Sequence, residues 1–182
     1  MSLHPRTSVR RYLAVLVTAF AALFGLSVAP AQAYYDSNSV YQIRPAHAQG
    51  MCLEVADWRK DNGAPVRQWP CTGQPNQQWR YVYDTNRSDV YWLKNVWSDK
   101  CLEIADWRTD NGAPARQWDC HYGANQTWVA NAGSPRLIHP EWSYAANKCL
   151  EIADWRTDNG APARLWDCYY NPNQNWYFDT VS

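Results

Sequence analysis

The sequence has no excess of charge of either sign, since 17 lysine and arginine residues balance 17 aspartate and glutamate residues. Nucleic-acid binding requires a clustered basic face, so this balance argues against a nucleic-acid partner. Histidine is scarce, and His47, His121 and His139 do not recur at equivalent positions of the repeats described below. The chain also lacks a nucleophile elbow, a metal-binding histidine pair and a Ser-His-Asp set. We therefore expect no catalytic residue, no metal site and no cofactor.

Long hydrophobic runs are absent apart from one near the amino terminus, Tyr12 to Val28. Three arginines precede this run, and Pro30 and the small-residue triplet Ala31-Gln32-Ala33 follow it. The pattern predicts a secretory signal peptide over residues 1–33, cleaved before Tyr34. An uncleaved membrane anchor is the alternative, although the run is just short of a comfortable span. We expect a secreted, extracellular protein of residues 34–182, forming one domain with no membrane insertion.

All six cysteines lie in the part predicted to be exported, and an oxidising compartment lets disulfides persist there. They form three pairs with the same spacing of 19 residues: Cys52 and Cys71, Cys101 and Cys120, Cys149 and Cys168. One bridge inside each pair is the economical prediction. Metal ligation is the competing interpretation, which the lack of a close-spaced C-x-x-C disfavours.

What the sequence does contain is a repeat. The segment CLEIADWRTDNGAPAR occupies residues 101–116 and again 149–164, and a near copy, CLEVADWRKDNGAPVR, occupies 52–67. Each copy also ends alike, with Asn76-Gln77-Gln78-Trp79, Asn125-Gln126-Thr127-Trp128 or Asn173-Gln174-Asn175-Trp176. The repeats cover about residues 41–83, 91–130 and 136–179. Three copies are too few for the usual propeller and leave none to spare as caps, so we predict a closed three-fold object.

Within each repeat the pattern has the period of strands, not of helices. In the first copy, short runs rich in β-branched and aromatic residues cover 41–45, 52–56, 65–71 and 77–83, separated by turn chemistry such as Asp61-Asn62-Gly63. The later copies follow the same plan, with opening strands at 91–95 and 136–140. We predict an all-β fold of twelve short strands around a pseudo-three-fold axis.

The predicted hairpin of each repeat brings a carboxylate close to an indole. Side chains alternate along a strand, so the apolar residues beside Glu54 face the core and Glu54 faces away from it. If the bridged cysteines face each other across an antiparallel pair, Glu54 lies opposite Trp69 and Ala56 lies opposite Arg67. The same arithmetic pairs Glu103 with Trp118 and Glu151 with Trp166.

An acid, an indole and a basic edge at one place suit a sugar. A sugar packs its C–H groups on an aromatic face, while its hydroxyls seek charged or amide partners. The closing Asn-Gln pairs supply amides if their loop folds back. The candidate sugar-binding residues are Glu54, Arg67, Trp69, Asn76 and Gln77 in the first copy, Glu103, Arg116, Trp118, Asn125 and Gln126 in the second, and Glu151, Arg164, Trp166, Asn173 and Gln174 in the third.

At these residues the chain resembles the ricin-type (R-type) lectins of the β-trefoil fold. The resemblance rests on Cys-Leu-acid-apolar, an Asn-Gly turn, a Trp two before the second Cys, and Gln-x-Trp, and it covers residues 34–182 three times. It implies a β-trefoil, glycan partners, commonly galactose or a related sugar, and ligand contacts from the acid, the aromatic and the Asn-Gln pair. Two departures bear on the sugar. Glu stands where the family usually has Asp, and Arg67 where it often has an amide such as Gln.

Several of these residues also have structural interpretations. Glu54 and Arg67 would be diagonal neighbours and form a half-exposed ion pair of small value, about 0 to 1 kcal/mol. Trp79, Trp128 and Trp176 at the ends of the closing pattern are expected in the core. Trp58, Trp107 and Trp155 either line a sugar pocket or cover the base of their own repeat. Asp61, Asp110 and Asp158 are expected to form turns.

Three functions therefore differ in what they require of the sequence. A secreted, non-catalytic lectin with up to three equivalent sites uses the residues that recur. A glycosidase would need one preorganised pair of carboxylates, for which Glu54 and Asp57 are the candidates. A protein-binding trefoil, such as a protease inhibitor, would act through a loop unique to one repeat. The recurrence of the polar residues favours the lectin, although recent duplication alone would also preserve them.

Overall fold

The structure of the chain is a computed structural model, and it describes residues 34–84, 87–130, 133–142 and 147–181. They all belong to one compact unit, Gln32–Ser182. No helix in these ranges is both long enough and apolar enough to span a membrane. The predicted signal peptide, residues 1–33, lies outside the described residues.

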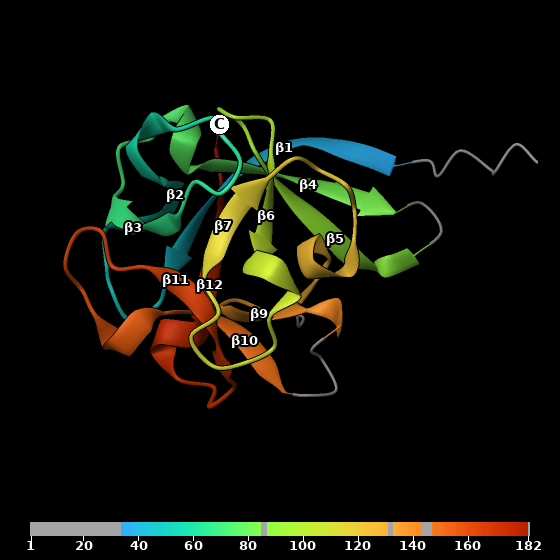
Figure 1. The fold of residues 1–182 in the computed structure, drawn as a ribbon. Helices are drawn as coiled ribbons and strands as arrows, with labels where there is room; N and C mark the ends of the chain where they lie inside the picture. The colour runs from blue at the N-terminus through green and yellow to red at the C-terminus, as the bar shows by residue number, and fades with distance from the viewer. Residues whose placement is uncertain (1–33, 85–86, 131–132, 143–146, 182) are drawn as a thin grey trace, which may run out of the picture. The chain divides into compact units, whose positions relative to one another are not determined.

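The described residues form twelve strands (Figure 1). Their bounds are β1 Tyr34–Pro45, β2 Met51–Val55, β3 Val66–Pro70, β4 Gln78–Asp84, β5 Arg87–Asn95, β6 Cys101–Ile104, β7 Ala115–Trp118, β8 Trp128–Ala130, β9 Arg136–Pro140, β10 Lys148–Ile152, β11 Ala163–Asp167 and β12 Asn175–Thr180. Six of them pair in the closed antiparallel order β4-β1-β12-β9-β8-β5 and back to β4. The other six form the hairpins β2-β3, β6-β7 and β10-β11. A six-stranded barrel with three hairpins is the β-trefoil, so the predicted fold is confirmed.

The three hairpins contact one another in a closed cycle. The turn of each hairpin hydrogen-bonds the return strand of the next, through Gly63 N–H to Gln117 C=O, Gly112 N–H to Leu165 C=O and Gly160 N–H to Gln68 C=O (2.8 to 3.0 Å). Gly63 adopts φ 85° in this turn, a conformation that side chains with a Cβ resist. The same turn packs on an indole of the next repeat, because a Cβ on Gly63 would lie 3.7 Å from the Trp118 ring. The repeated Asp-Asn-Gly turn is therefore part of the interface between repeats.

The three predicted disulfides are present: Cys52–Cys71, Cys101–Cys120 and Cys149–Cys168. The predicted register was wrong by two residues, however. Cys52 lies opposite Trp69, and Glu54 lies opposite Arg67 instead of Trp69. The error came from placing the two cysteines face to face. β3 ends at Pro70, and Cys71 beyond it donates its N–H to Gly50 C=O. Cys71 therefore lies opposite Gly50, and its bridge to Cys52 closes on a diagonal.

Three tryptophans fill the centre of the unit. Trp79, Trp128 and Trp176 are fully buried, as predicted. Each indole N–H donates to the carbonyl of the leucine that follows the first half-cystine, from Trp79 to Leu53 C=O (3.0 Å), from Trp128 to Leu102 C=O (3.1 Å) and from Trp176 to Leu150 C=O (3.1 Å). The acid of each repeat directly follows this leucine, as Glu54 follows Leu53. The buried indole therefore fixes the backbone next to the acid.

Two of the three boundaries between repeats carry an additional charged contact. Asp119 accepts a hydrogen bond from Asn62 Nδ2 (2.7 Å) and pairs with Lys100, and its own N–H donates to Asn62 Oδ1 (3.0 Å). Asp167 repeats this arrangement at the next boundary. The equivalent position at the third boundary is Pro70, which carries no carboxylate.

We expect the variant Asp119→Asn/Asp167→Asn to lose stability near neutral pH and to match the wild type in strong acid. The ammonium of Lys100 and the amide of Asn62 hold the pKa of Asp119 below its ordinary value, and equivalent contacts lower the pKa of Asp167. A lowered folded-state pKa contributes stability above the unfolded-state value, about 4, and the contribution disappears as the pH falls through the folded-state value. Thermal unfolding at about pH 6 and about pH 2 measures this; an equal loss at both would contradict it.

Candidate functional site

Glu54 is the centre of a nearly buried polar network. β2 places it opposite Arg67 of β3, and its side chain is only 5 % exposed. Its Oε1 accepts from Arg67 Nε (3.0 Å), and its Oε2 accepts from Asn76 Nδ2 (3.2 Å) and Gln77 Nε2 (3.1 Å). A carboxylate offers about four acceptor positions, so three are already used. The expected ion pair is therefore present, and it is more buried than a half-exposed pair.

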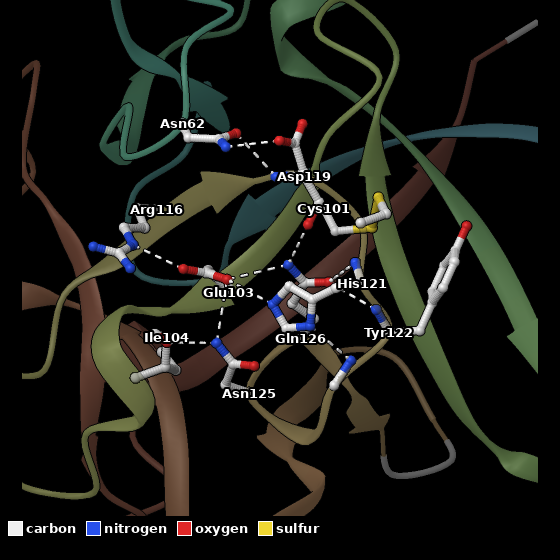
Figure 2. A network of polar contacts seen from close by, with 12 residues as sticks. Asn62, Cys101, Glu103, Ile104, Arg116, Asp119, His121, Tyr122, Asn125 and Gln126 are labelled. Atoms are coloured by element: carbon white, nitrogen blue, oxygen red, sulfur yellow. Dashed lines mark hydrogen bonds and ion pairs between the residues drawn. A yellow bond between two sulfur atoms is a disulfide. The ribbon is translucent and has the colours of Figure 1, made fainter.

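The other two repeats contain the same network. Glu103 accepts from Arg116, Asn125 and Gln126 at 2.8, 3.2 and 3.1 Å, as Figure 2 shows. Glu151 accepts from Arg164, Asn173 and Gln174 at 2.9, 3.3 and 3.1 Å. Four of the five residue types predicted for the site thus meet in each repeat. The glutamines hydrogen-bond the carboxylate from the protein interior, because Gln77, Gln126 and Gln174 are at most 1 % exposed.

The loop that carries the Asn-Gln pair does fold back onto the hairpin. It is the short turn η2 (Pro75–Gln77), with equivalents η4 (Ala124–Gln126) and η7 (Pro172–Gln174). Asn76 Nδ2 donates to both Glu54 and Val55 C=O, which fixes the orientation of its amide. Asn76 Oδ1 is then buried without a partner among the described residues, and the same holds for Asn125 and Asn173. An unpaired buried carbonyl oxygen costs about 1–3 kcal/mol, so the asparagine is held in place at a cost in stability.

Arg67 connects the buried acid to two more exposed groups. Its Nη2 donates to Asp57 Oδ1 (2.8 Å), and its guanidinium carbon lies 4.5 Å from the centre of the Trp69 ring. The equivalent arginines lie 4.4 and 4.1 Å from Trp118 and Trp166. Such cation–π contacts hold the indole and the guanidinium in a fixed relation. Glu54 and Trp69, predicted to face each other, are therefore connected through Arg67, which contacts both.

Asp57 and Trp58 extend the site beyond the residues predicted for it. They belong to the turn η1 (Ala56–Trp58), and both adopt left-handed backbone, with φ of 55° and 57°. Consecutive left-handed residues other than glycine are strained, and such strain clusters at functional sites. The turns η3 (Ala105–Trp107) and η6 (Ala153–Trp155) repeat it. The Asp57 side chain is 67 % exposed and Trp58 is 44 % exposed, so each presents its functional group to solvent.

Two of these networks open into clefts. The first cleft has a volume of about 270 Å³ and is lined by Glu54, Asp57, Trp58, Arg67, Trp69, Thr72, Gln74 and Asn76. The third has a volume of about 200 Å³ and is lined by Glu151, Asp154, Trp155, Arg164, Trp166, Tyr169, Asn171 and Asn173. Trp58 and Trp155, whose role the sequence left open, therefore line clefts. These volumes are below the range of drug-sized pockets and suit one small ring.

One cluster in the described part of the chain has the composition of a metal site. Ligand atoms of His139, Cys149 and Cys168 lie within 4.8 Å of one another. Both sulfurs are joined in the third disulfide, so neither is a thiolate, which is the form that binds metal. The cluster as it stands does not fit a metal ion.

A barrel with three hairpins, each carrying one copy of the same polar and aromatic site, defines a repeated binding module. Residues 39–176 match the family described as ricin-type β-trefoil lectin domain, and the chain belongs to this family. Membership supports carbohydrate binding as the general function.

Known proteins similar to this chain agree with that placement. The ribosome-inactivating protein PMRIPt of Polygonatum multiflorum is 27 % identical over 85 residues, which cover 44 % of this chain and 14 % of that protein. This chain thus spans only a small part of that relative. The designed 3-fold symmetric protein ThreeFoil matches with a TM-score of 0.72 and 27 % identity, over 78 % of this chain and 99 % of that one. A ricin B-like lectin of Macrolepiota procera, solved with lactose, shares the fold at TM-score 0.65 and 18 % identity, over 81 % and 99 %.

Proposed function

We propose that this protein is a secreted, non-catalytic lectin that binds one sugar ring in each accessible cleft. The observation that carries the proposal is the cleft over the first and the third network, which brings an exposed aspartate, an arginine and two indoles to one place. Family membership supports the same conclusion.

The chemistry of the cleft suits the two sides of a sugar. Trp58 and Trp69 offer aromatic surface for the C–H groups of the ring. Asp57 has one carboxylate oxygen that accepts from Arg67, and the carboxylate is largely exposed, so it accepts from hydroxyls. Glu54 is an orienting group in this arrangement, since its carboxylate is already engaged by three donors.

The same engagement argues against the glycosidase. A general acid or base must reach the proton it transfers, whereas Glu54 is 5 % exposed and tied to Arg67. Three copies of one weak site favour avidity instead, because linked sites gain about 10² to 10⁴ through effective concentration. Galactose-like sugars are the first candidates by resemblance to the family. Two departures from the family pattern are expected to alter the specificity: Glu in place of Asp, and Arg67 in place of an amide.

A glycan array with residues 34–182 tests the proposal, followed by Trp69→Ala, Trp118→Ala and Trp166→Ala singly and together. Each loss of an indole removes a stacking surface, so we expect binding to fall in stages and to disappear in the triple variant. Tyr177→Ala is the control, because Tyr177 lies on β12 outside the two clefts. Unchanged glycan binding by the triple variant would refute the clefts as the sugar-binding sites. Binding to a partner protein that free sugar does not inhibit would favour the protein-binding alternative.

A further inference from the structure

The three networks have the same residues in and around the carboxylate cluster. They differ at two positions on the rim of the site, which we call the lip. The first lip position follows the second half-cystine and is Thr72, His121 or Tyr169; the second lies two residues later and is Gln74, Gly123 or Asn171. Both positions line the first and the third cleft. The acid, the aspartate, both tryptophans, the arginine and the asparagine are the same in all three repeats. Differences between the sites therefore arise mainly at these two positions.

In the second repeat the His121 ring turns inward over the network. Its Nε2 lies 3.6 Å from Glu103 Oε2, and its ring stacks on Trp107 with centroids 6.2 Å apart and an interplanar angle of 28°. Figure 2 shows the imidazole beside Glu103. Trp107 is the equivalent of Trp58, whose face lines the first cleft. His121 thus lies against both the acid and the indole that a sugar would contact, while its own side chain stays 41 % exposed.

Gly123 makes this position of the ring accessible. Its N–H donates to His121 Nδ1 (3.1 Å), so the hydrogen of the neutral ring is on Nε2, toward Glu103. A Cβ at residue 123 would lie 2.7 Å from His121 Nδ1 and 3.0 Å from the Trp107 ring. The other two repeats have a Cβ at this position, on Gln74 and Asn171. The inward ring therefore needs histidine and glycine together.

We propose that His121 and Gly123 form an internal plug in the second site, so that this site binds sugar more weakly than the other two. This inference rests on the proposed function. A sugar entering the second cleft must first displace the ring from Glu103, Trp107 and the Gly123 N–H. Displacing one contact of ordinary hydrogen-bond strength weakens binding about tenfold.

Titration with lactose, followed through the indole N–H signals in ¹H–¹⁵N spectra, reports each site separately. We expect Trp118 to need about tenfold more lactose than Trp69 or Trp166. In His121→Thr/Gly123→Gln, which copies the first lip, Trp118 should respond at the same lactose concentration as Trp69. Gly123 has φ −71°, so glutamine fits its backbone. Equal saturation of all three signals in the wild type would overturn the plug.

The reverse exchange is the matched control. Thr72→His/Gln74→Gly installs the plug in the first repeat, and we expect Trp69 to respond about tenfold later while Trp166 is unchanged. If Trp69 keeps its wild-type curve although the introduced imidazole adopts the inward position, the plug does not control affinity and the inference is wrong.

A measurement without sugar separates this inference from the proposed function. In the free protein we expect a nuclear Overhauser contact between the His121 ring and the Trp107 indole, with hydrogen on Nε2. Gly123→Ala should abolish the contact, because the added Cβ displaces the ring. Absence of the contact in the wild type refutes the plug. Failure of all three indoles to respond to lactose, with the contact intact, counts against the proposed sugar and not against the plug.

Discussion

Replacement of Trp79 by alanine is expected to lower the free energy of unfolding by about 3–5 kcal/mol. Trp79 is fully buried, and its indole N–H donates to Leu53 C=O. Truncation therefore leaves a cavity and also removes the donor from a buried carbonyl. Urea denaturation followed by circular dichroism measures the change. A loss under about 1 kcal/mol would show that the three central indoles are not the main packing of the core.

Trp58→Ala makes the same chemical change at a half-exposed position and is the control. Trp58 contacts Trp97 edge to face, with centroids 5.0 Å apart, so we expect a loss of at most about 1 kcal/mol. If the clefts bind sugar, this variant should lose affinity in the first cleft while remaining folded. The pair of variants thus separates the tryptophans of the core from those of the site.

Much of the fold follows from the sequence because its signals are local and occur three times. The Gln-x-Trp pattern identifies Trp79 as core, and equal spacing within each repeat identifies the disulfides, which the structure has. The register does not follow, because it depends on where β3 ends. Cys71 lies one residue beyond the end of β3 and reaches Cys52 on a diagonal. Sequence spacing alone does not distinguish a diagonal bridge from a direct one.

The sequence predicts which residues make up the site. It does not predict which of them contact a ligand and which only hold the others in place. Glu54, Arg67, Trp69, Asn76 and Gln77 meet as expected, but burial decides which of them can touch a ligand. The exposed carboxylate belongs to the aspartate of Ala-Asp-Trp, and its three-fold repetition was the available signal. His121 does not recur, so the repeat pattern gives it no role. Its contact with Glu103 depends on Gly123 and on the fold of the loop, neither of which a repeat pattern reports.

Replacement of Arg67 by methionine is expected to destabilise the protein by about 3 kcal/mol. Methionine keeps most of the packing volume, but Glu54 would then be a nearly buried charge with only two amide donors. The arginine side chain is 20 % exposed, so some water can reach the carboxylate, and we place the loss at the lower end of the range for broken buried pairs. Urea denaturation near neutral pH measures the loss, and Arg116→Met and Arg164→Met should repeat it.

The double variant Glu54→Gln/Arg67→Met decides whether charge is the cause. A glutamine carbonyl oxygen can still accept from Asn76 and Gln77, and no unpaired charge is left, so most of the lost stability should return. Stability as low in the double variant as in Arg67→Met would instead assign the loss to packing against Trp69. Sugar binding in the first cleft should be weak in both variants, because Asp57 and Trp69 each lose the guanidinium that positions them. Recovery of stability without recovery of binding would show two separate roles of Arg67. Its contact with Glu54 stabilises the fold, and its contacts with Asp57 and Trp69 position the sugar-binding groups.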